Sequence, residues 1–266
     1  VYGVLGLLYI EPELRENQGE IEAGLAGELP KLIDTPDILG DLHCHSDWDG
    51  GENSLEELVE AGQKMDYQYI GIADHTKFLR IEHGLDEKQL LQQKKAIEKI
   101  NAKLKNFKLL QGCETNIMAD GAVDIKDEVL AQMDYVIAGV HSQFKMPKEK
   151  MTQRIIKAMQ NPHIDIISHP TGRILQRRDE YAIDLDKILK AAKATGTILE
   201  INASPVRLDL KDTNIKKAKE AEVKMAINTD SHQIEQLNFM EYGIAQARRG
   251  FAEKKYINNP WQVEKL

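Results

Sequence analysis

The chain has 266 residues and a formal net charge of −8 at pH 7. That charge argues against a basic surface that coats nucleic acid, but it leaves a phosphorylated substrate open, because bound divalent ions would add positive charge at the site itself. No apolar run approaches the roughly 20 residues of a membrane helix. We also see no charged-then-apolar signal-peptide pattern, and we expect no membrane association. The two cysteines, Cys44 and Cys113, lie far apart in the sequence, which favours a cytoplasmic, reduced protein without a disulfide framework.

Residues 1–37 differ in composition from the rest of the chain. Val1–Ile10 is apolar and broken by glycines, Glu11–Glu28 is acidic, and two prolines bracket the short connector that follows. Such a stretch, without a repeating apolar period, is typical of a linker. We predict that it is the tail of a preceding domain plus a linker, in a fragment of a longer protein. Residues 38–266 are then predicted to form one domain.

From Ile38 onward, apolar runs alternate with helical patterns. Each run is bounded by turn or helix signals, as a buried strand is. The predicted strands are Ile38–His45, Gln68–His75, Phe107–Glu114, Asp134–His141, Asp165–His169, Thr197–Asn202 and Lys224–His232. The predicted helices are Ser54–Met65, Asp86–Leu104, Ile125–Met133, Lys148–Gln160, Asp184–Thr195, Asp212–Glu222 and Glu235–Arg249. This alternation predicts an α/β fold with a parallel sheet, and about seven units favour a (β/α) barrel over an open sheet.

Nearly every predicted strand finishes in a residue that can bind a metal. These endings are His43 and His45, Asp74 and His75, Glu114, His141, His169, and Asp230 and His232, while the sixth strand ends in Glu200 and Asn202. Barrel enzymes carry their chemistry at the carboxyl ends of the strands. We therefore predict that these side chains converge on one polar site, and that the site is a metal cluster.

Two of the endings have the same spacing. Side chains alternate along a strand, so His43 and His45 point the same way and can hold one ion, while Cys44 faces the other side. An isolated His-x-His would more simply be two unrelated polar residues in a loop. Asp230-Ser231-His232 repeats the spacing at the seventh strand, which favours ligands. Cys44 is interpreted as a small buried apolar residue rather than a thiolate ligand.

Asp49 and His75 are weaker candidates when taken alone. Asp49 precedes two glycines, where aspartate is usually just a turn residue, and only its closeness to His45 makes it a candidate ligand. Neighbours on a strand face opposite ways, so His75 is the predicted ligand and Asp74 is predicted to orient a neighbour.

Glu114, His141 and His169 complete the predicted ligand set. Glu114 could bridge two ions with its two carboxylate oxygens, and the alternative is a capping or salt-bridged glutamate. His141 and His169 each follow a strongly apolar strand, where a lone histidine is more often a hydrogen-bonded core residue. Two of them beside the other clusters are predicted to be ligands.

Basic residues lie near the predicted mouth of the barrel at Lys77, Arg80, Arg173 and Arg207. Charged loop residues are usually only solvated, but the guanidinium group fits phosphate oxygens well. Arg173 directly follows His169-Pro170, and Arg207 follows the sixth strand. We favour these two as phosphate contacts because of their positions, with Lys77 and Asn202 as further substrate contacts.

An ordered set of motifs resembles the PHP (polymerase and histidinol phosphatase) family. It consists of Asp41-Leu42-His43-Cys44-His45-Ser46, Ala73-Asp74-His75-Thr76, Gly112-Cys113-Glu114, Gly139-Val140-His141-Ser142, Ser168-His169-Pro170-Thr171-Gly172-Arg173 and Asn228-Thr229-Asp230-Ser231-His232. Finer features resemble the PHP domain at the C-terminus of bacterial and archaeal family X DNA polymerases: Glu200–Leu210, Tyr242-Gly243, Ala247–Gly250 and Tyr9–Glu16. Residues 1–37 then look like the end of a polymerase region and its linker.

The resemblance implies a distorted (β/α)7 TIM-like barrel that holds two or three divalent ions. It would group His43, His45, Glu114 and Asp230 around the first ion, and Glu114 with His141 and His169 around the second. Asp49, His75 and His232 would hold the third ion, although the segment between His45 and Gly50 is one residue shorter than the usual family pattern. Imidazole and carboxylate ligands without a thiolate suit zinc, manganese or iron. Catalysis would rest on Glu114, Asp230, His232 and Arg173.

Clustered divalent ions suit hydrolysis of phosphate esters, because they activate water and neutralise phosphate oxygens. By resemblance the substrate is a DNA 3′ end, attacked by a 3′–5′ exonuclease with 3′-phosphate or abasic-site processing as related activities, and the partner is a polymerase domain in cis. A small-molecule phosphatase of the histidinol-phosphate type would need the same metals. A non-catalytic scaffold for a polymerase is the third alternative, and the filled ligand positions argue against it.

Overall fold

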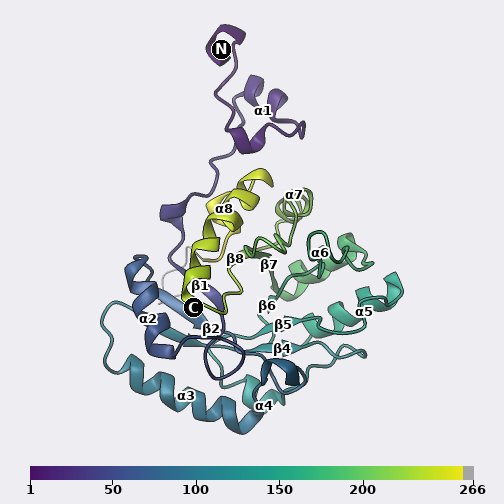
Figure 1. The fold of residues 1–266 in the computed structure, drawn as a ribbon. Helices are drawn as coiled ribbons and strands as arrows, with labels where there is room; N and C mark the ends of the chain where they lie inside the picture. The colour runs from purple at the N-terminus through teal and green to yellow at the C-terminus, as the bar shows by residue number, and fades with distance from the viewer. Residues whose placement is uncertain (260–266) are drawn as a thin grey trace.

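The computed structural model describes residues 1–259, and residues 260–266 of the predicted domain 38–266 lie outside the described part. The fold is α/β, with parallel strands inside and helices around them (Figure 1). No helix among residues 1–259 is long and apolar enough to cross a membrane.

The strands form two parallel sheets. The first sheet has the order β1-β2-β3 and the second has the order β4-β5-β6-β7-β8. Their bounds are β1 Gly40–Cys44, β2 Tyr69–Ile72, β3 Lys108–Gln111, β4 Glu114–Asn116, β5 Ile137–Gly139, β6 Ile166–Ile167, β7 Ile198–Asn202 and β8 Met225–Asn228. Each strand pairs with the next along the chain within its sheet, which is the order that repeated strand–helix units predict.

The predicted strand Phe107–Glu114 is split into β3 and β4, so the expected seven strands are eight segments among the described residues. The break falls at Gly112-Cys113, where the Tyr135 ring packs so closely that a Cβ on Gly112 would lie 2.6 Å from its Cζ. The Tyr135 hydroxyl donates to the carbonyls of Leu42 (2.7 Å) and Ile72 (3.0 Å). This ring therefore fills the space between the strands where the ladder is interrupted.

Isolated bridges join the two sheets. His75 pairs with Glu114 beyond the end of β2, and Cys44 pairs with Ser231 beyond the end of β8. The His45 amide donates to Ser231 O at 2.8 Å. The residues that follow β1, β2 and β8 are thus held side by side at the carboxyl ends of the strands.

The helices lie close to their predicted positions. They are α2 Leu55–Lys64, α3 Glu87–Asn101, α4 Asp127–Leu130, α5 Lys148–Met159, α6 Leu185–Thr195, α7 Asp212–Glu220 and α8 Met240–Arg249. Ser54 and Glu57 form the capping box at the start of α2. The predicted helix Ile125–Met133 is reduced to the single turn α4, and the predicted helix Glu235–Arg249 begins as the 3-10 turn Ile234–Phe239 before α8.

Two apolar layers enclose the strands. The inner one is the cluster Leu42, Tyr69, Ala73, Leu110, Tyr135, Ile137 and Ile166. The outer, larger one lies between strands and helices and includes Cys44, which confirms its interpretation as a buried apolar residue. A register shift between Asp41 and Cys44 allows Leu42 to face inward while Cys44 faces outward. Both layers fix the strand ends from which the site is built.

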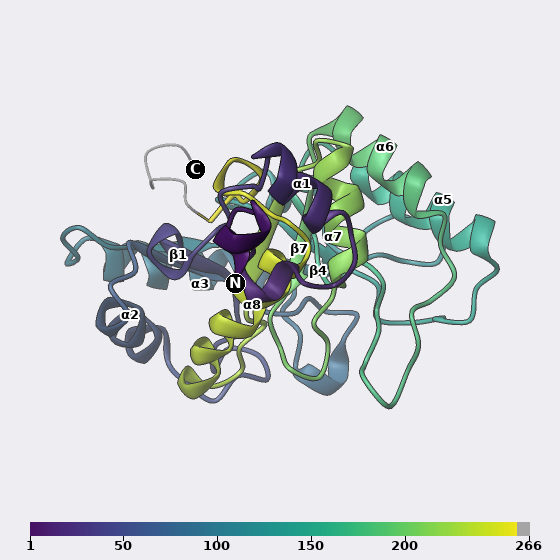
Figure 2. The same cartoon turned by 90° about the horizontal axis from the view of Figure 1, so that it is seen from above.

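Residues 1–37 form a short arm that contains α1 Glu20–Ala26 and projects beyond α8 (Figure 1). Seen from above, the arm lies over α7 and α8 (Figure 2). Ile10, Leu14 and Leu32 pack on Phe251 in a separate small core. At the end of α8, Arg248 Nε lies 2.6 Å from Glu13 Oε1, and Arg249 Nη1 lies 2.8 Å from Glu16 Oε1. Two motifs from opposite ends of the sequence are therefore in direct contact.

Candidate metal centre

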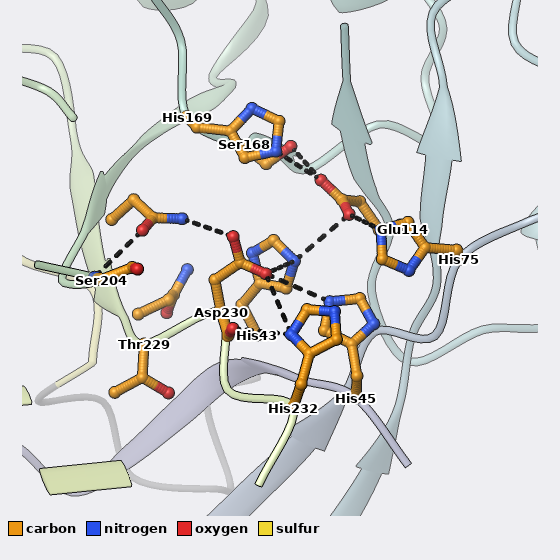
Figure 3. Close-up of polar contacts among 12 residues, drawn as sticks. His43, His45, His75, Glu114, Ser168, His169, Ser204, Thr229, Asp230 and His232 are labelled. Carbon is orange, nitrogen blue, oxygen red and sulfur yellow. Dashed lines mark hydrogen bonds and ion pairs between the residues drawn. The ribbon is translucent and has the colours of Figure 1, made fainter. Parts of the chain in front are cut away.

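Six histidines from the ends of five strands converge at the carboxyl edge of the sheets. Ring centroids lie 4.3 Å apart for His45 and His75, 4.1 Å for His45 and His232, and 5.2 Å for His141 and His169. His43 lies beside His45, with centroids 5.1 Å apart. Figure 3 shows most of these rings around Glu114 and Asp230, whose carboxylates point into the group. The structure thus brings together the predicted ligands from all along the chain.

Glu114 lies between two histidine pairs. Its Oε1 is 2.9 Å from His169 Nε2 and 3.3 Å from His141 Nε2. Its Oε2 is 3.1 Å from His75 Nε2 and 3.5 Å from His43 Nε2. The Ser168 hydroxyl also donates to Oε1 at 2.6 Å. The two oxygens therefore face two separate sets of ring nitrogens, which is the geometry a bridging carboxylate requires.

Asp230 occupies the opposite wall and also divides its oxygens. Oδ1 lies 3.3 Å from His45 Nε2 and 3.6 Å from His43 Nε2. Oδ2 accepts a hydrogen bond from Asn202 Nδ2 at 3.1 Å and lies 3.3 Å from Arg207 Nε. One oxygen thus faces the histidines, while the other faces the groups that could contact a substrate.

Acceptors behind the rings set which nitrogen faces the centre. Glu200 Oε1 lies 2.7 Å from His43 Nδ1, and Asn116 Oδ1 lies 2.7 Å from His141 Nδ1. An acceptor at Nδ1 holds the proton there and leaves the Nε2 lone pair free, which is how metal-binding imidazoles are usually oriented. No role was predicted for Asn116, because it lies past the predicted end of its strand.

Asp49 lies on the Nδ1 side of two rings. Its Oδ2 is 2.9 Å from both His45 Nδ1 and His75 Nδ1, and it accepts the His75 amide at 2.7 Å. In this arrangement Asp49 contacts two imidazoles, and it also shares a group of candidate donor atoms with His45 and Asp74. Asp74 accepts hydrogen bonds from the amide and hydroxyl of Ser46, so it braces the turn behind His45, in keeping with its predicted orienting role.

The charges around the cluster decide its protonation. Burial opposes ionisation of Glu114, but the imidazoles of His141 and His43 outweigh it and hold the Glu114 pKa well below its usual range. Burial lowers the pKa of His169, and the nearby Arg207 lowers it further. Burial opposes protonation of His43 and His45 as well, but the carboxylates beside them outweigh it and raise both pKa values. At neutral pH Glu114 is therefore an anion and His169 a neutral imidazole, whereas a metal ion would have to displace protons from His43 and His45.

The carboxyl group of Asp41, which lies beneath the site, has a raised pKa. Burial raises the pKa of Asp41 to about 6, although Thr229 and the His43 amide donate hydrogen bonds to it. Asp41 thus supports the backbone of His43 from beneath the site.

Several inward-facing atoms have no hydrogen-bond partner among residues 1–259. They are His43 Nε2, His45 Nε2, Glu114 Oε2 and both ring nitrogens of His169. Unpaired buried polar atoms are costly, and so many in one place indicate a missing ligand. Four groups among the described residues place donor atoms within 4.8 Å of one another: His43, His45 and Asp230; His75, Glu114 and His141; His45, His75 and His232; and His45, Asp49 and Asp74. The residues present therefore fit a cluster of divalent ions.

Two residues of the cluster have backbone conformations that few side chains adopt. His169 has φ 30° and Asp230 has φ 56°. Left-handed conformations at non-glycine residues are disfavoured and concentrate at functional sites, where the surrounding structure imposes them. Here the His169 amide donates to Glu200 Oε2 at 2.7 Å. The strand end is thus bent so that the ring faces the centre.

The predicted basic residues are placed differently from one another. Arg207 faces the site beside Asp230, and its buried Nη1 has no hydrogen-bond partner among the described residues. Arg173 donates from Nε to Arg207 O at 2.8 Å and from Nη2 to Leu208 O. Lys77 Nζ lies 2.6 Å from Glu87 Oε1, so its ammonium group is paired with α3. Arg207 is the predicted phosphate contact whose position fits best.

Residues 41–204 match the family model described as "PHP domain", which covers more than half of the chain. The chain therefore belongs to the PHP domain family. It is 44% identical over 258 residues to the DNA polymerase/3'-5' exonuclease PolX of Bacillus subtilis, covering 97% of this chain and 45% of that protein. The chain thus spans less than half the length of this relative, and the resemblance to family X polymerases is confirmed.

Other relatives are shorter proteins. A probable phosphatase of Thermoanaerobacter sp. is 32% identical over 204 residues, covering 72% of this chain and 78% of that protein. Among solved structures, the histidinol phosphate phosphatase of Lactococcus lactis, complexed with zinc, L-histidinol and phosphate, is similar with a TM-score of 0.54 and 16% identity. It covers 79% of this chain and 94% of that structure. This likeness shows the shared fold.

The donor groups lead to a prediction about metal content. Protein purified without chelator and reloaded with zinc or manganese should carry at least two equivalents, because Glu114 and Asp230 face different histidine sets. Elemental analysis after gel filtration measures this ratio. Finding one equivalent or none in folded protein would contradict a cluster.

Proposed function

We propose that the chain is a metal-dependent phosphoesterase that hydrolyses DNA phosphodiesters at 3′ ends, as a 3′–5′ exonuclease that belongs to a family X DNA polymerase. The observation that carries the proposal is the group of buried ring nitrogens around Glu114 Oε2 that, like this oxygen, have no hydrogen-bond partner among residues 1–259. Similarity to PolX along 97% of the chain supports DNA as the substrate. Processing of 3′-phosphates or abasic sites would use the same chemistry.

In this proposal one ion would be held by His43, His45, Glu114 and Asp230, and a second by Glu114, His141 and His169. A third would be held by His75 and His232, together with Asp49. When bound, such ions lower the pKa of water toward ~7 and neutralise charge on phosphate oxygens. Zinc, manganese and iron all suit these ligands.

The protein's own contribution is orientation and charge. Glu200 and Asn116 keep His43 and His141 turned so that their Nε2 atoms face the centre. Arg207 contacts the phosphate of the substrate with its free Nη1, and Asn202 holds the Asp230 oxygen beside it. The catalytic role of Glu114, Asp230 and His232 would be to hold the metal ions in place.

The remaining architectural predictions are part of the same proposal. We infer one distorted barrel, since the bridges at Cys44–Ser231 and His75–Glu114 link the two sheets. We infer that residues 1–37 belong to a polymerase region and its linker, held against the domain by Arg248 and Arg249. The two free, buried cysteines are in keeping with a cytoplasmic location.

The test compares a polymer with a small substrate. Protein loaded with manganese should shorten a 5′-labelled single-stranded oligonucleotide stepwise and release the label of a 3′-labelled one at once. Added salt should slow this reaction with a shallow dependence, because few phosphate contacts are available on an acidic protein. Histidinol phosphate at matched concentration should be a poor substrate.

Each of the other outcomes favours an alternative function. Rapid cleavage of histidinol phosphate with intact DNA would support a small-molecule phosphatase, the activity named for the similar Lactococcus structure. If neither substrate is cleaved by fully loaded protein, the non-catalytic scaffold is favoured.

A further inference from the structure

The loop that follows β7 carries Arg207 and is folded tightly on itself. The amides of Arg207 and Leu208 both donate to Ser204 O, at 2.8 and 2.9 Å. Leu208 has φ 44°, a left-handed conformation that a branched side chain rarely adopts. Local preference therefore does not account for the shape of this loop, and contacts from elsewhere must hold it.

Those contacts come from the loop that follows β6. The Thr171 hydroxyl donates to Asp209 Oδ1 at 2.9 Å, and the Leu175 amide donates to Val206 O at 2.7 Å. Arg173 provides the link nearest to Arg207, since its guanidinium donates to the carbonyls of Arg207 and Leu208 themselves. A planar fork that donates to two successive carbonyls fixes the orientation of the peptide between them.

We propose that Arg173 is a positioning residue that acts through Arg207, rather than a direct phosphate contact. By holding the carbonyls of Arg207 and Leu208, it sets the backbone from which the Arg207 side chain reaches Asp230 and the substrate phosphate. Two of its nitrogens are already committed to backbone oxygens, whereas Arg207 keeps a buried nitrogen without a partner among the described residues. This inference rests on the proposed phosphoesterase function.

A double-mutant cycle tests it on the metal-loaded protein. Arg207→Ala should lower kcat/KM for oligonucleotide cleavage on the order of 10- to 100-fold, the usual effect of losing a hydrogen bond to a charged group. Arg173→Ala should lower it about 10-fold in the native background, but less than about 2-fold when Arg207 is already alanine, because contacting residues that act through one another are not additive. Additive losses would show that Arg173 contacts the substrate by itself and would overturn the proposal.

Arg173→Lys distinguishes the effect of the two backbone hydrogen bonds from that of the positive charge. It also provides a second test if the alanine variant is poorly folded. Lysine keeps the positive charge but cannot donate to two carbonyls as a fork. The lysine variant should therefore lose nearly as much activity as the alanine variant. Activity close to that of the native protein would indicate a direct electrostatic contact and would contradict positioning.

Arg178→Ala is the matched control. Arg178 lies in the same loop, donates to Gly172 O at 2.8 Å and stacks 3.8 Å from the centre of the Phe144 ring. Among residues 1–259 its guanidinium donates to no carbonyl of the Arg207 loop. It should change thermal stability without coupling to Arg207→Ala. If Arg178→Ala and Arg173→Ala couple equally to Arg207→Ala, the whole loop after β6, and not the two hydrogen bonds of Arg173, positions Arg207.

Calorimetric titration with inorganic phosphate separates this inference from the proposed function. Phosphate affinity of the metal-loaded protein should fall together in Arg173→Ala and Arg207→Ala, and no further in the double variant. If the native protein cleaves no phosphoester but the phosphate cycle is coupled, the function fails and the positioning role stands. If DNA is cleaved but the phosphate cycle is additive, the positioning role fails alone.

Discussion

Replacement of Glu114 with glutamine should reduce hydrolysis on the order of 10³-fold, at or beyond the 10²–10³ that loss of one charge-stabilising group typically costs. Each Glu114 oxygen faces a different histidine pair, and the side chain is buried. Glutamine has nearly the same shape, but it carries no charge, and its NH2 group would face ring nitrogens as a donor. Two cations on either side would lose their shared anion. Single-turnover rates on a labelled oligonucleotide, together with metal content, measure the loss.

Asp49→Asn is the paired control, because it also removes one buried charge beside two histidines. Asparagine can still accept one hydrogen bond at the Oδ2 position between His45 and His75. Loss of such an orienting group typically costs 10- to 100-fold. The Glu114 variant should therefore be the weaker enzyme. Small and equal losses in the two variants would mean that Glu114 is an ordinary buried carboxylate and bridges nothing.

The ends of the strands could be predicted from the sequence because they depend on the pattern of neighbouring residues. A buried apolar run that stops at a polar residue marks where a strand leaves the core, and parallel strands all leave at one edge. His141 and His169 were found in this way, and the structure places both within 3.3 Å of Glu114. The helices were predicted for the same reason, as the capping box at Ser54 illustrates.

What sequence reasoning missed depends on long-range packing. The break between β3 and β4 follows from the Tyr135 ring, which no local pattern at Gly112 reveals. The hydrogen bond from His43 to Glu200 joins residues 157 positions apart. The Arg173 guanidinium donates to carbonyls 34 and 35 residues further along the chain, which no local pattern around Arg173 predicts. Sequence shows which side chains reach the site, while the orienting partners appear only after folding.

Glu200→Gln should weaken metal binding about 10- to 100-fold, the cost expected when a partner behind a ligating histidine is lost. Oε1 of Glu200 lies 2.7 Å from His43 Nδ1 and accepts from Asn228 Nδ2 at 3.0 Å. Oε2 accepts from the His169 amide at 2.7 Å and from Asn202 Nδ2 at 3.1 Å. Both oxygens thus receive donors only, so the NH2 group of glutamine must face donors at one of them.

Glu200→Gln should also lower the free energy of unfolding. A buried donor left without its partner costs about 1–3 kcal/mol, and the metal-free protein should show this loss in urea unfolding. Asp165→Asn is the control for losing an exposed carboxylate that accepts a backbone hydrogen bond away from the site. Asp165 accepts the Val136 amide at 2.8 Å just before β6, at the opposite end of the strand from the site. It should lower stability and leave metal affinity unchanged.

Competition with a fluorescent chelator gives the metal affinities of both variants and of the native protein. Glu200 fixes the His43 tautomer, so the affinity of Glu200→Gln should also depend more steeply on pH, since the imidazole must then lose a proton without a carboxylate to hold the other nitrogen. If Glu200→Gln and Asp165→Asn lose equal stability and neither changes metal affinity, Glu200 serves the core rather than the site. In that case His43 would be oriented by Glu114 and Asp230 alone, which lie 3.5 and 3.6 Å from its Nε2.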